Sequence, residues 1–536
     1  MRIDRRRALA LLGLGAAAPA KAQPAEQLAF RHGVASGDPL QDRVVIWTRI
    51  SGATGQTPYR WRLGDRSGEG VTGPERDHTV KVDVTGLQPG QEYRFTFEAG
   101  GVRSPEGRTK TLPAGATRDV VLAVASCTLF PNGYFNAYRA IADLPRVDAV
   151  LHLGDYIYEY GGRDSYGMRS PVASLRPHEP DREIVSLADY RARHAQYKSD
   201  PDLQAAHARA PWIVAWDDHE TANDSFSGGA ENHTAASEGD WNARKAAALK
   251  AYFEWMPIRD PAPGQDFVQA SSRAFRFGDL AQLIMIETRL AARDKQLTHK
   301  SDLFPGGRLD LEGFRRKLRD PARRMMGPAQ EAWIAQELAA SVNAGHAWQV
   351  IGNQVVMARV DGSPNKVLKP AEAAKISPSA KRRFDERAEI AALGVPVALD
   401  MWDGYPLDRE RLYGLFRQAK ARPVVLSGDS HSFWANELHD DSGRRVACEF
   451  GTTSITSPGA GELAPGLDWG EVVARANKEV RYNNQTAHGF VLLTLTRNEA
   501  RADMVAVSTI HDRRFKTRAV KTFRAKPEGQ GVSALA

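Results

Sequence analysis

The stretch VLHLGDYIYEYGG, from Val150 to Gly162, places a polar turn directly after a largely apolar run. The first five residues have the character of a strand that is buried on both faces of a sheet. Asp155 follows at once, and tyrosines, a glutamate and a glycine pair complete the stretch. In open α/β sheets the carboxyl ends of the strands hold ligands. The stretch is therefore typical of an α/β sheet, and its polar turn would lie at the edge where such sheets hold ligands.

The same rhythm continues from about residue 120 to the end of the chain. Apolar runs such as VVLAVAS, PWIVAW, LAQLIMIE, AWQVIGN and PVVLSGD alternate with helical patterns such as EGDWNARKAAALKAYFEW. Strands that alternate with helices are typical of layered α/β domains. Apolar and aromatic residues make up 42% of the 536-residue chain, which is enough for a large core. We therefore predict one large α/β domain over residues 118–526.

The preceding segment, residues 28–115, has a different pattern. DRVVIWTRI, YRWRLG, HTVKVDV and QEYRFTFEA are short runs rich in β-branched and aromatic residues, separated by turn clusters such as LQPGQ. This pattern predicts a small β-sandwich. VTGLQPGQEYRFTFEA resembles the strand, turn and strand of a fibronectin type III module, a kind of module that positions or binds.

Residues 1–22 have the features of an export signal: a charged start, a short apolar run and a small-residue exit. The run is too short to span a bilayer. Arg5, Arg6 and Arg7 directly before it resemble a twin-arginine signal, and an ordinary Sec signal is the alternative. We expect an exported protein, periplasmic or secreted, that uses the twin-arginine translocation machinery.

Removal of residues 1–22 deletes five basic residues and one acidic residue, so the formal net charge falls from +7 to +3. The net positive charge of the full chain therefore gives no indication of specific nucleic-acid recognition. We also expect a monomer. Cys127 and Cys448 lie in different contexts, which favours two free thiols, although one disulfide is possible in an exported protein.

Three long segments fit neither helix nor strand patterns. They cover residues 161–186, 290–326 and 362–403 and are rich in Arg, Lys, Pro and Gly. Insertions of this length in a compact domain are usually lids or binding loops, and simple surface decoration is the alternative for each.

The ends of the predicted strands share one property, which is that polar residues follow them. A lone aspartate at a strand end is usually a turn cap. Several carboxylates that meet at one sheet edge repel one another unless a cation is present, so this set predicts a metal site. The strand ends carry Cys127; Asp155; Asp217, Asp218, His219 and Glu220; Asn353 and Gln354; and Asp429, Ser430 and His431.

The types of ligand in this set suit two kinds of metal. A thiolate and a phenolate favour a strongly Lewis-acidic or softer transition ion, whereas carboxylates and an amide oxygen suit a hard ion such as calcium, magnesium or manganese. Tyr158 lies three residues after Asp155 and can face the same ion in a tight turn. We expect Tyr156 and Tyr160 to pack.

Seven motifs together resemble the PhoD-like family of alkaline phosphatases and phosphodiesterases. They are GVASGDPLQDRVVIWTR, GDYIYE, WDDHE, GNQ, GDSH, TTSITSPG and NNQTAHGF, in this order along residues 30–506. The wider resemblance is to calcineurin-like and purple acid phosphatase enzymes. It implies a four-layer α/β/β/α metallophosphoesterase sandwich behind the fibronectin III-like domain.

The resemblance also implies the metals and their ligands. Asp155 would bridge two ions, Fe3+ and Ca2+. The ferric ion would be completed by Cys127, Tyr158 and His431, and the calcium ion by Asp218, Asn353 and Asp429. Purple acid phosphatases have softer donors at the second ion than this chain has. The oxygen ligands of this chain therefore agree with calcium.

The implied reaction is hydrolysis of phosphate mono- and diesters by a metal-activated hydroxide. His219 would stabilise the developing charge or protonate the leaving group. Asp217 would support a ligand or bind an additional metal, and Arg289 and Arg293 are candidates for phosphate binding. The alternative substrates are phospholipid headgroups, cleaved as by a phospholipase D, or polymeric phosphodiesters.

Two other classes of protein explain the sequence less well. A carbohydrate- or surface-binding protein on a degenerate enzyme scaffold predicts lost ligands, but every ligand position carries a competent donor. A serine esterase of the α/β-hydrolase type needs G-x-S-x-G, and SGDSHSF lacks that spacing. We expect Trp402 and Trp434 to wall the site.

Overall fold

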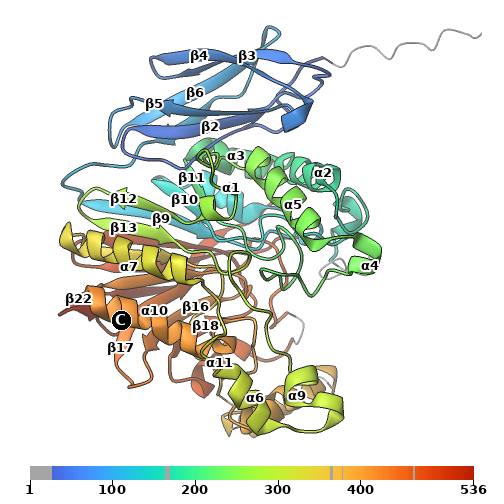
Figure 1. The fold of residues 1–536 in the computed structure, drawn as a ribbon, viewed down its shortest axis with the longest axis vertical. Helices are drawn as coiled ribbons and strands as arrows, with labels where there is room; N and C mark the ends of the chain where they lie inside the picture. The colour runs from blue at the N-terminus through green and yellow to red at the C-terminus, as the bar shows by residue number, and fades with distance from the viewer. Residues whose placement is uncertain (1–26, 163–169, 363–365, 377, 463–464) are drawn as a thin grey trace, which may run out of the picture.

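The structure is a computed structural model that describes residues 27–162, 170–362, 366–376, 378–462 and 465–536. Two large β-sheets pack face to face, and helices cover their outer faces (Figure 1). The expected four-layer α/β/β/α sandwich with an N-terminal β-sandwich is confirmed. The predicted export signal, residues 1–22, lies outside the described residues.

The first sheet has nine strands, and its central strands are largely apolar, as VVLAVA in β9 shows. Strands β9, β10 and β11 are mutually parallel, so their carboxyl ends lie at one edge. The order across the sheet is β21 (Thr517–Ala525), β20 (Ala500–Val507), β19 (His488–Thr496), β9 (Asp119–Ala125), β10 (Ala149–His152), β11 (Trp212–Val214), β1 (Val34–Gly37), β2 (Arg43–Arg49) and β5 (Thr79–Thr85).

The second sheet has seven strands, of which β13, β14, β15 and β17 run parallel to one another. Its order is β12 (Arg273–Phe277), β13 (Ala281–Met285), β14 (Trp348–Gly352), β15 (Pro423–Ser427), β17 (Arg445–Gly451), β16 (Phe433–His439) and β18 (Val480–Asn484). Side chains from both sheets, among them Leu122, Leu151, Leu283 and Phe450, form the core between them.

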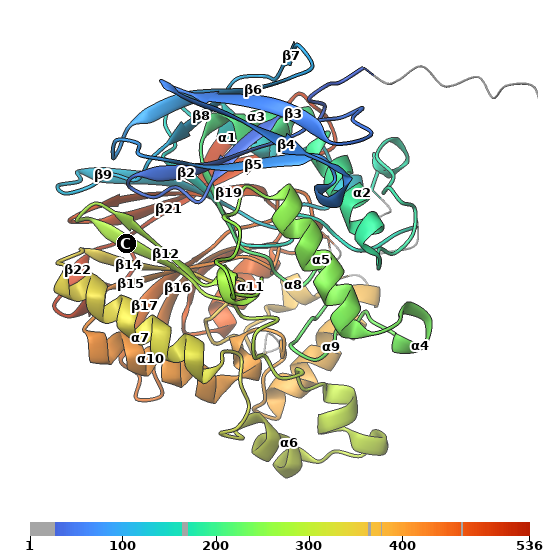
Figure 2. The same ribbon diagram turned by 45° about the horizontal axis from the view of Figure 1, so that its top comes forward.

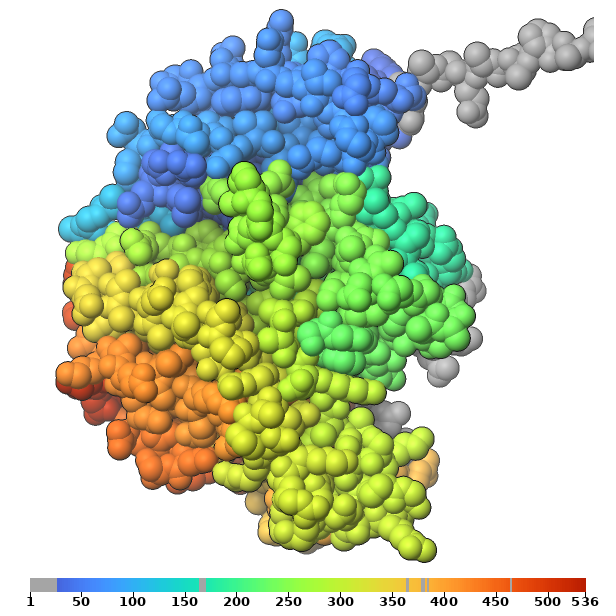
Figure 3. Space-filling view, in the orientation of Figure 1, coloured from blue at the N-terminus to red at the C-terminus, as the bar shows by residue number. Residues whose placement is uncertain are grey.

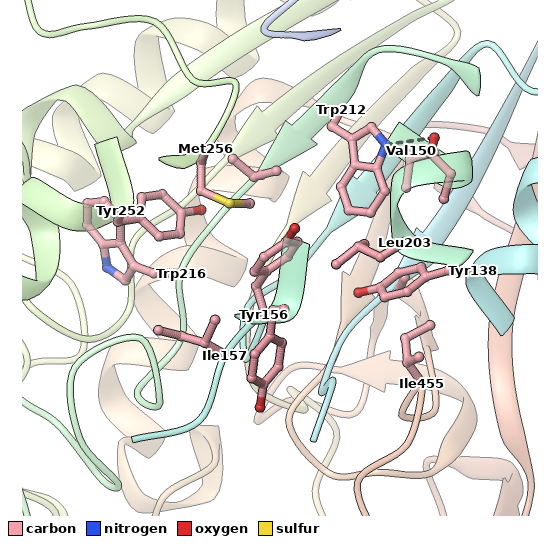
Figure 4. Close-up of a cluster of buried hydrophobic side chains, with 14 of the residues drawn as sticks. Tyr138, Val150, Tyr156, Ile157, Leu203, Trp212, Trp216, Tyr252, Met256 and Ile455 are labelled. Atoms are coloured by element: carbon pink, nitrogen blue, oxygen red, sulfur yellow. Dashed lines mark hydrogen bonds between the residues drawn. The ribbon is translucent and has the colours of Figure 1, made fainter. Parts of the chain in front are cut away.

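The outer face of the nine-stranded sheet is covered by α1 (Asn136–Ala142), α2 (Leu187–Lys198), α3 (Pro201–Arg209) and α5 (Trp241–Trp255). Figure 4 shows Tyr138, Tyr156 and Trp212 packed in this layer. The seven-stranded sheet is covered by α7 (Pro328–Asn343) and α10 (Pro406–Ala419). Three further helices, α4 (Ala235–Glu238), α8 (Pro370–Ala373) and α11 (Trp469–Ala476), lie in the connections.

The N-terminal sandwich shares a sheet with the larger α/β part. Its outer sheet contains β3 (Thr57–Leu63), β4 (Arg66–Thr72), β6 (Glu92–Ala99), β7 (Val102–Arg103) and β8 (Gly107–Lys110). Its inner sheet is β1, β2 and β5, and β1 pairs with β11 through Gly37 and Trp212. The nine-stranded sheet is therefore continuous across both parts. The N-terminal sandwich is the blue part at the top of the molecule (Figures 1 and 2).

Two of the three long segments that fit neither helix nor strand patterns, residues 290–326 and 362–403, pack together into one small body. Residues Leu297, Leu303, Phe314 and Leu318 of one segment pack against Val395 and Leu399 of the other. The helices α6 (Leu311–Leu318) and α9 (Pro378–Ala392) belong to this body, which we call the cap. It protrudes at the end of the molecule opposite the N-terminal sandwich (Figure 3).

The last strands, β22 (Pro527–Glu528) and β23 (Gly531–Val532), form a two-stranded ribbon against β17. Within the part of the chain that is described, no helix has the length and apolar character needed to cross a bilayer.

Candidate metal centre

The two large sheets meet at the edge formed by the carboxyl ends of their parallel strands. Ser126, after β9, forms a β-bridge with Ser454, after β17. Gly428, after β15, donates its N–H to the carbonyl of Gln354, after β14, at 2.7 Å. Segments far apart in the sequence are therefore brought together at one edge, as the strand-end pattern predicts.

Four of the predicted metal ligands have left-handed backbone conformations. The φ angles are 60° at Cys127, 56° at Asp155, 60° at Asp429 and 53° at His431. Residues other than glycine adopt this region rarely, and it persists where the surroundings hold it in place, often at functional sites. The chain therefore turns sharply after β9, β10 and β15, at the residues that are the potential ligands.

The first group of potential ligands consists of Cys127, Asp155 and His431, whose ligand atoms lie within 4.8 Å of one another. The hydroxyl of Tyr158 lies 3.1 Å from Oδ2 of Asp155 and 3.2 Å from Nε2 of His431. Tyr158 is fully buried. A thiol, a phenol, an imidazole and a carboxylate thus converge on one point.

The second group consists of four carboxylates, those of Asp155, Asp217, Asp218 and Asp429, again with ligand atoms within 4.8 Å. A third group joins Asp155 and Asp218 to His219. Asp155 belongs to all three groups. Its Oδ2 accepts a hydrogen bond from the hydroxyl of Tyr158, and its Oδ1 accepts one from the N–H of His219 at 3.4 Å.

Asn353 lies at the end of β14, next to the strand that leads to Asp429. Its amide oxygen accepts a hydrogen bond from Nε1 of Trp402 at 3.1 Å. Both side chains are fully buried. Trp402 therefore orients the amide of Asn353, which agrees with its expected place in the wall of the site. Trp434 donates Nε1 to Oγ of Ser430 at 2.7 Å in the neighbouring turn.

The electrostatics of the centre favour a cation. Burial and the neighbouring carboxylates raise the pKa of Asp155 and of Asp429 well above the usual range. Burial raises the pKa of Asp217 to about 6, and its Oδ2 is buried with no hydrogen-bond partner among the described residues. A bound cation lowers these pKa values again, because it stabilises the charged carboxylates. The donor set therefore fits a softer or strongly Lewis-acidic ion beside a hard one.

Arg289 lies among these carboxylates and is fully buried. Its Nε contacts Asp217, and its Nη2 lies 3.7 Å from Asp218 and 3.5 Å from Asp429. Although burial favours neutral acids, Arg289 and His219 lower the pKa of Asp218. The guanidinium therefore supplies part of the positive charge that the carboxylates need.

Arg293 is linked to Arg289 and the centre through Asp400. It is fully buried, donates to the side chain and the carbonyl of Asp400, and lies over the ring of Tyr405. Asp400 also accepts from Nη1 of Arg289 at 2.8 Å. Sequence reasoning missed Asp400 because it lies in the long segment 362–403, directly after Leu399 of the cap, where no strand end marks it.

His219 has a carboxylate partner that sequence reasoning also missed. Its Nδ1 donates to Oε2 of Glu159 at 2.6 Å, and Glu159 accepts further bonds from the N–H of Asn223 and the amide of Asn232, both at 2.8 Å. The ring of His219 lies 4.2 Å from that of Tyr158. Burial opposes protonation, but Glu159, Asp218 and Asp155 raise the pKa of His219 well above its usual value.

Glu220 links the turns that follow strands β10 and β11. Its carboxylate accepts from the N–H of Asp155 at 3.0 Å, of Tyr156 at 2.6 Å and of Asp217 at 2.8 Å. It therefore fixes the turns after β10 and β11 rather than facing the centre. Cys127 and Cys448 are buried free thiols, in agreement with the favoured expectation.

Comparisons with known proteins give one family. A family model described as PhoD-like phosphatase matches residues 122–504, and another, described as PhoD-like phosphatase, N-terminal domain, matches residues 15–113. The chain is 34% identical over 498 residues to Alkaline phosphatase D of Bacillus subtilis (strain 168), a match that covers 88% of this chain and 77% of that protein. A solved structure described as Structure of PhoD has a TM-score of 0.77 at 31% identity, covering 94% of this chain and 91% of the other.

Proposed function

The chain belongs to the PhoD-like phosphatase family, and from that premise we propose that it is an exported, metal-dependent alkaline phosphatase and phosphodiesterase. The resemblance expected from the seven motifs is confirmed. Membership makes the chain a phosphoric ester hydrolase of the alkaline phosphatase D type.

The proposal depends above all on the place of Asp155, whose ligand atoms belong to all three potential metal groups. We assign it to both ions. The remaining ligands of Fe3+ are Cys127, Tyr158 and His431, and those of Ca2+ are Asp218, Asn353 and Asp429. When bound, such a pair supplies a water of lowered pKa and neutralises the charge of the phosphoryl oxygens.

His219 is the proposed catalytic residue. Glu159 holds its Nδ1, so Nε2 is the ring nitrogen that remains for the substrate. A protonated imidazole in this place donates its proton to the leaving oxygen of the ester. The hydrogen bond to Glu159 raises the pKa of His219, which favours the protonated ring that this role requires.

Arg289 is the proposed phosphate-binding residue nearest the centre, because its Nη2 is buried without a hydrogen-bond partner among the described residues. A guanidinium can bind two phosphoryl oxygens at once. Arg293 supports it through Asp400, which contacts both arginines. Asp217 pairs with Arg289 and supports Asp218, its neighbour in the chain, or binds an additional metal.

We retain the domain division of residues 28–115 and 118–526 and the twin-arginine-type signal over residues 1–22, with a periplasmic or secreted location. The substrates are phosphate mono- and diesters, including polymeric phosphodiesters, and the alternative is cleavage of phospholipid headgroups in the manner of a phospholipase D. Rates on a phosphomonoester, a small diester and phosphatidylcholine vesicles would separate these substrate classes.

Metal analysis combined with a visible spectrum tests the assignment. We expect iron and calcium in the purified protein, with a charge-transfer band from phenolate to ferric ion. Tyr158→Phe should remove the band, whereas Tyr160→Phe should keep it, because Tyr160 stacks beside Tyr158 and is expected to pack rather than to bind a metal. A protein that contains zinc alone and has no band contradicts the assignment.

A further inference from the structure

Two of the family motifs contribute no metal ligand, and the structure brings them together beside the centre. They are TTSITSPG, residues 452–459, and NNQTAHGF, residues 483–490. Thr453 donates Oγ1 to the carbonyl of Ala487 at 2.6 Å, and Gly489 donates its N–H to the carbonyl of Ser454 at 3.1 Å. His488 Nδ1 lies 3.0 Å from Oγ of Ser454. The second motif therefore holds the first in place.

The other side of the first motif contacts the backbone of Cys127. The carbonyl of Cys127 accepts the N–H of Thr456 and of Ser457, each at 3.3 Å, and Oγ of Ser457 lies 3.0 Å from it. Pro458 accepts a hydrogen bond from Nδ1 of His431 at 3.0 Å. One short segment thus fixes the backbone of one proposed iron ligand and the ring orientation of another.

Ser457 also reaches the third of these ligands. Its Oγ lies 2.7 Å from the hydroxyl of Tyr158, and both side chains are fully buried. A serine hydroxyl has one proton, so it donates either to the carbonyl of Cys127 or to the oxygen of Tyr158. A phenolate is a stronger acceptor than a neutral carbonyl, because bonds to ionised groups are about twice as strong. Binding of a metal by Tyr158 therefore directs the proton of Ser457 to the phenolate.

We propose that Ser457 is a positioning residue that donates a hydrogen bond to the metal-bound phenolate oxygen of Tyr158 and so sets its orientation and donor strength. The inference rests on the proposed function, because it needs Tyr158 as a metal ligand. Partners of metal ligands typically change metal affinity or activity by about 10–100-fold when they are removed.

Ser457→Ala tests the role in the iron- and calcium-loaded protein. Loss of the donor leaves more charge on the phenolate, so the charge-transfer band should move to longer wavelength. Loss of orientation should speed the release of iron to a chelator by about 10-fold. The control is Thr456→Val, because Oγ1 of Thr456 donates to the carbonyl of Leu129 and not to a ligand. This variant should keep the band position and the rate of release.

A double-mutant cycle separates this role from a general packing effect. In a Tyr158→Phe background the acceptor of the hydrogen bond is absent, so Ser457→Ala should no longer change the rate of iron release. An undiminished effect in that background would mean that Ser457 acts through Cys127, which overturns the proposal.

The band of the wild-type protein distinguishes a failure of the role of Ser457 from a failure of the proposed iron site. A wild-type band that Ser457→Ala leaves unmoved overturns the role of Ser457 and leaves the proposed iron site intact. Wild-type protein that binds iron without any such band overturns the phenolate ligand, and the role of Ser457 with it.

Discussion

Glu159 and His219 form a buried carboxylate–imidazole pair, with 2.6 Å between Oε2 and Nδ1. Glu159 follows the proposed ligand Tyr158 directly in the chain, and His219 follows the proposed ligand Asp218. The same two turns that deliver metal ligands therefore also build the proposed proton donor. This geometry fixes which ring nitrogen carries the transferable proton, because Nδ1 is occupied by Glu159.

Glu159→Gln should lower kcat by about 10–100-fold on an alkyl phosphate ester, within the usual contribution of general acid catalysis. An amide no longer stabilises the imidazolium, so the pKa of His219 falls. Activity needs the protonated ring and is lost as the pH rises through this pKa. The alkaline limb of the kcat profile should therefore move to lower pH, as measured across pH 7–11.

Glu231→Gln is the matched control for Glu159. Glu231 accepts a hydrogen bond from the amide of Asn223 on the same loop, and within the described part of the chain no hydrogen bond or ion pair joins it to His219. Its profile should follow that of the wild-type enzyme. His219→Ala should abolish the difference between the two glutamate variants; a His219→Ala enzyme with full metal content and full turnover on the alkyl ester would contradict the assigned role.

Arg289→Gln should make the stability of the protein depend more strongly on calcium. Removal of one partner from a buried ion pair usually costs about 3–5 kcal/mol, and Arg289 serves Asp217, Asp218 and Asp429 together. A calcium ion restores positive charge at the same carboxylates. The rise in Tm on transfer from chelator to calcium should therefore be larger for the variant than for wild type.

Arg293→Gln provides the comparison, because Arg293 pairs with Asp400 and not with the four-carboxylate group. Its gain in Tm from calcium should equal that of wild type. Equal gains for all three proteins would mean that Arg289 and calcium do not neutralise the same charges.

The strand-end pattern could predict the ligand groups, because an apolar run followed by Asp or Cys is visible in the sequence and the sheet edge follows from topology. The partners of these residues could not be predicted in the same way. Asp400 lies in the cap connection and Ser457 in a turn after β17, so their contacts depend on how distant segments meet. Local pattern has no information on such long-range pairings.

The nine-stranded sheet that the two parts share also depends on a long-range pairing that local sequence patterns do not reveal. The runs of β2 and β5 predict a sandwich, and the sandwich exists, but the sequence does not reveal that β1 pairs in parallel with β11. The junction consists of the pair Gly37 and Trp212, where a side chain at residue 37 would collide with the carbonyls of Trp212 and Pro257. Close approach of this kind depends on tertiary structure and has no periodic signal.

Buried histidines should make the protein sensitive to acid. Burial lowers the pKa of His32, His152 and His194 to about 3. In the unfolded chain these rings bind protons near pH 6.5, so the unfolded state binds more protons between pH 6.5 and 3. The free energy of unfolding should therefore fall as the pH drops below about 6.5, as followed by Tm at pH 5 and pH 7.5.

His194→Phe should reduce this sensitivity. Both ring nitrogens of His194 are buried without a hydrogen-bond partner among the described residues, and the ring stacks on Trp255 with centroids 6.4 Å apart. A phenyl ring keeps the stacking and cannot bind a proton. The drop in Tm between pH 7.5 and pH 5 should shrink by about 2 °C or more, whereas His511→Gln at an exposed site should leave the drop unchanged.

Gly154 and Gly162 provide a final pair of variants within the stretch from Val150 to Gly162. Both have positive φ angles, +110° and +75°. A Cβ atom at residue 154 would lie 2.4 Å from both N and Cβ of Asp217, whereas one at residue 162 would meet no atom within 4 Å. Gly154→Ala should therefore push the ends of β10 and β11 apart, and Gly162→Ala should add only the strain of a left-handed residue, about 1–2 kcal/mol.

The metal content of the two variants shows whether the approach of these strand ends builds the centre. Gly154→Ala should lose most of its iron and calcium, because Asp155 and Asp217 follow the displaced backbone. Gly162→Ala should keep both metals with a modest fall in Tm. If Gly154→Ala binds both metals as wild type does, then Asp155 reaches its ligand position without close contact between the two turns, and the role assigned to Glu220 in holding them together is wrong.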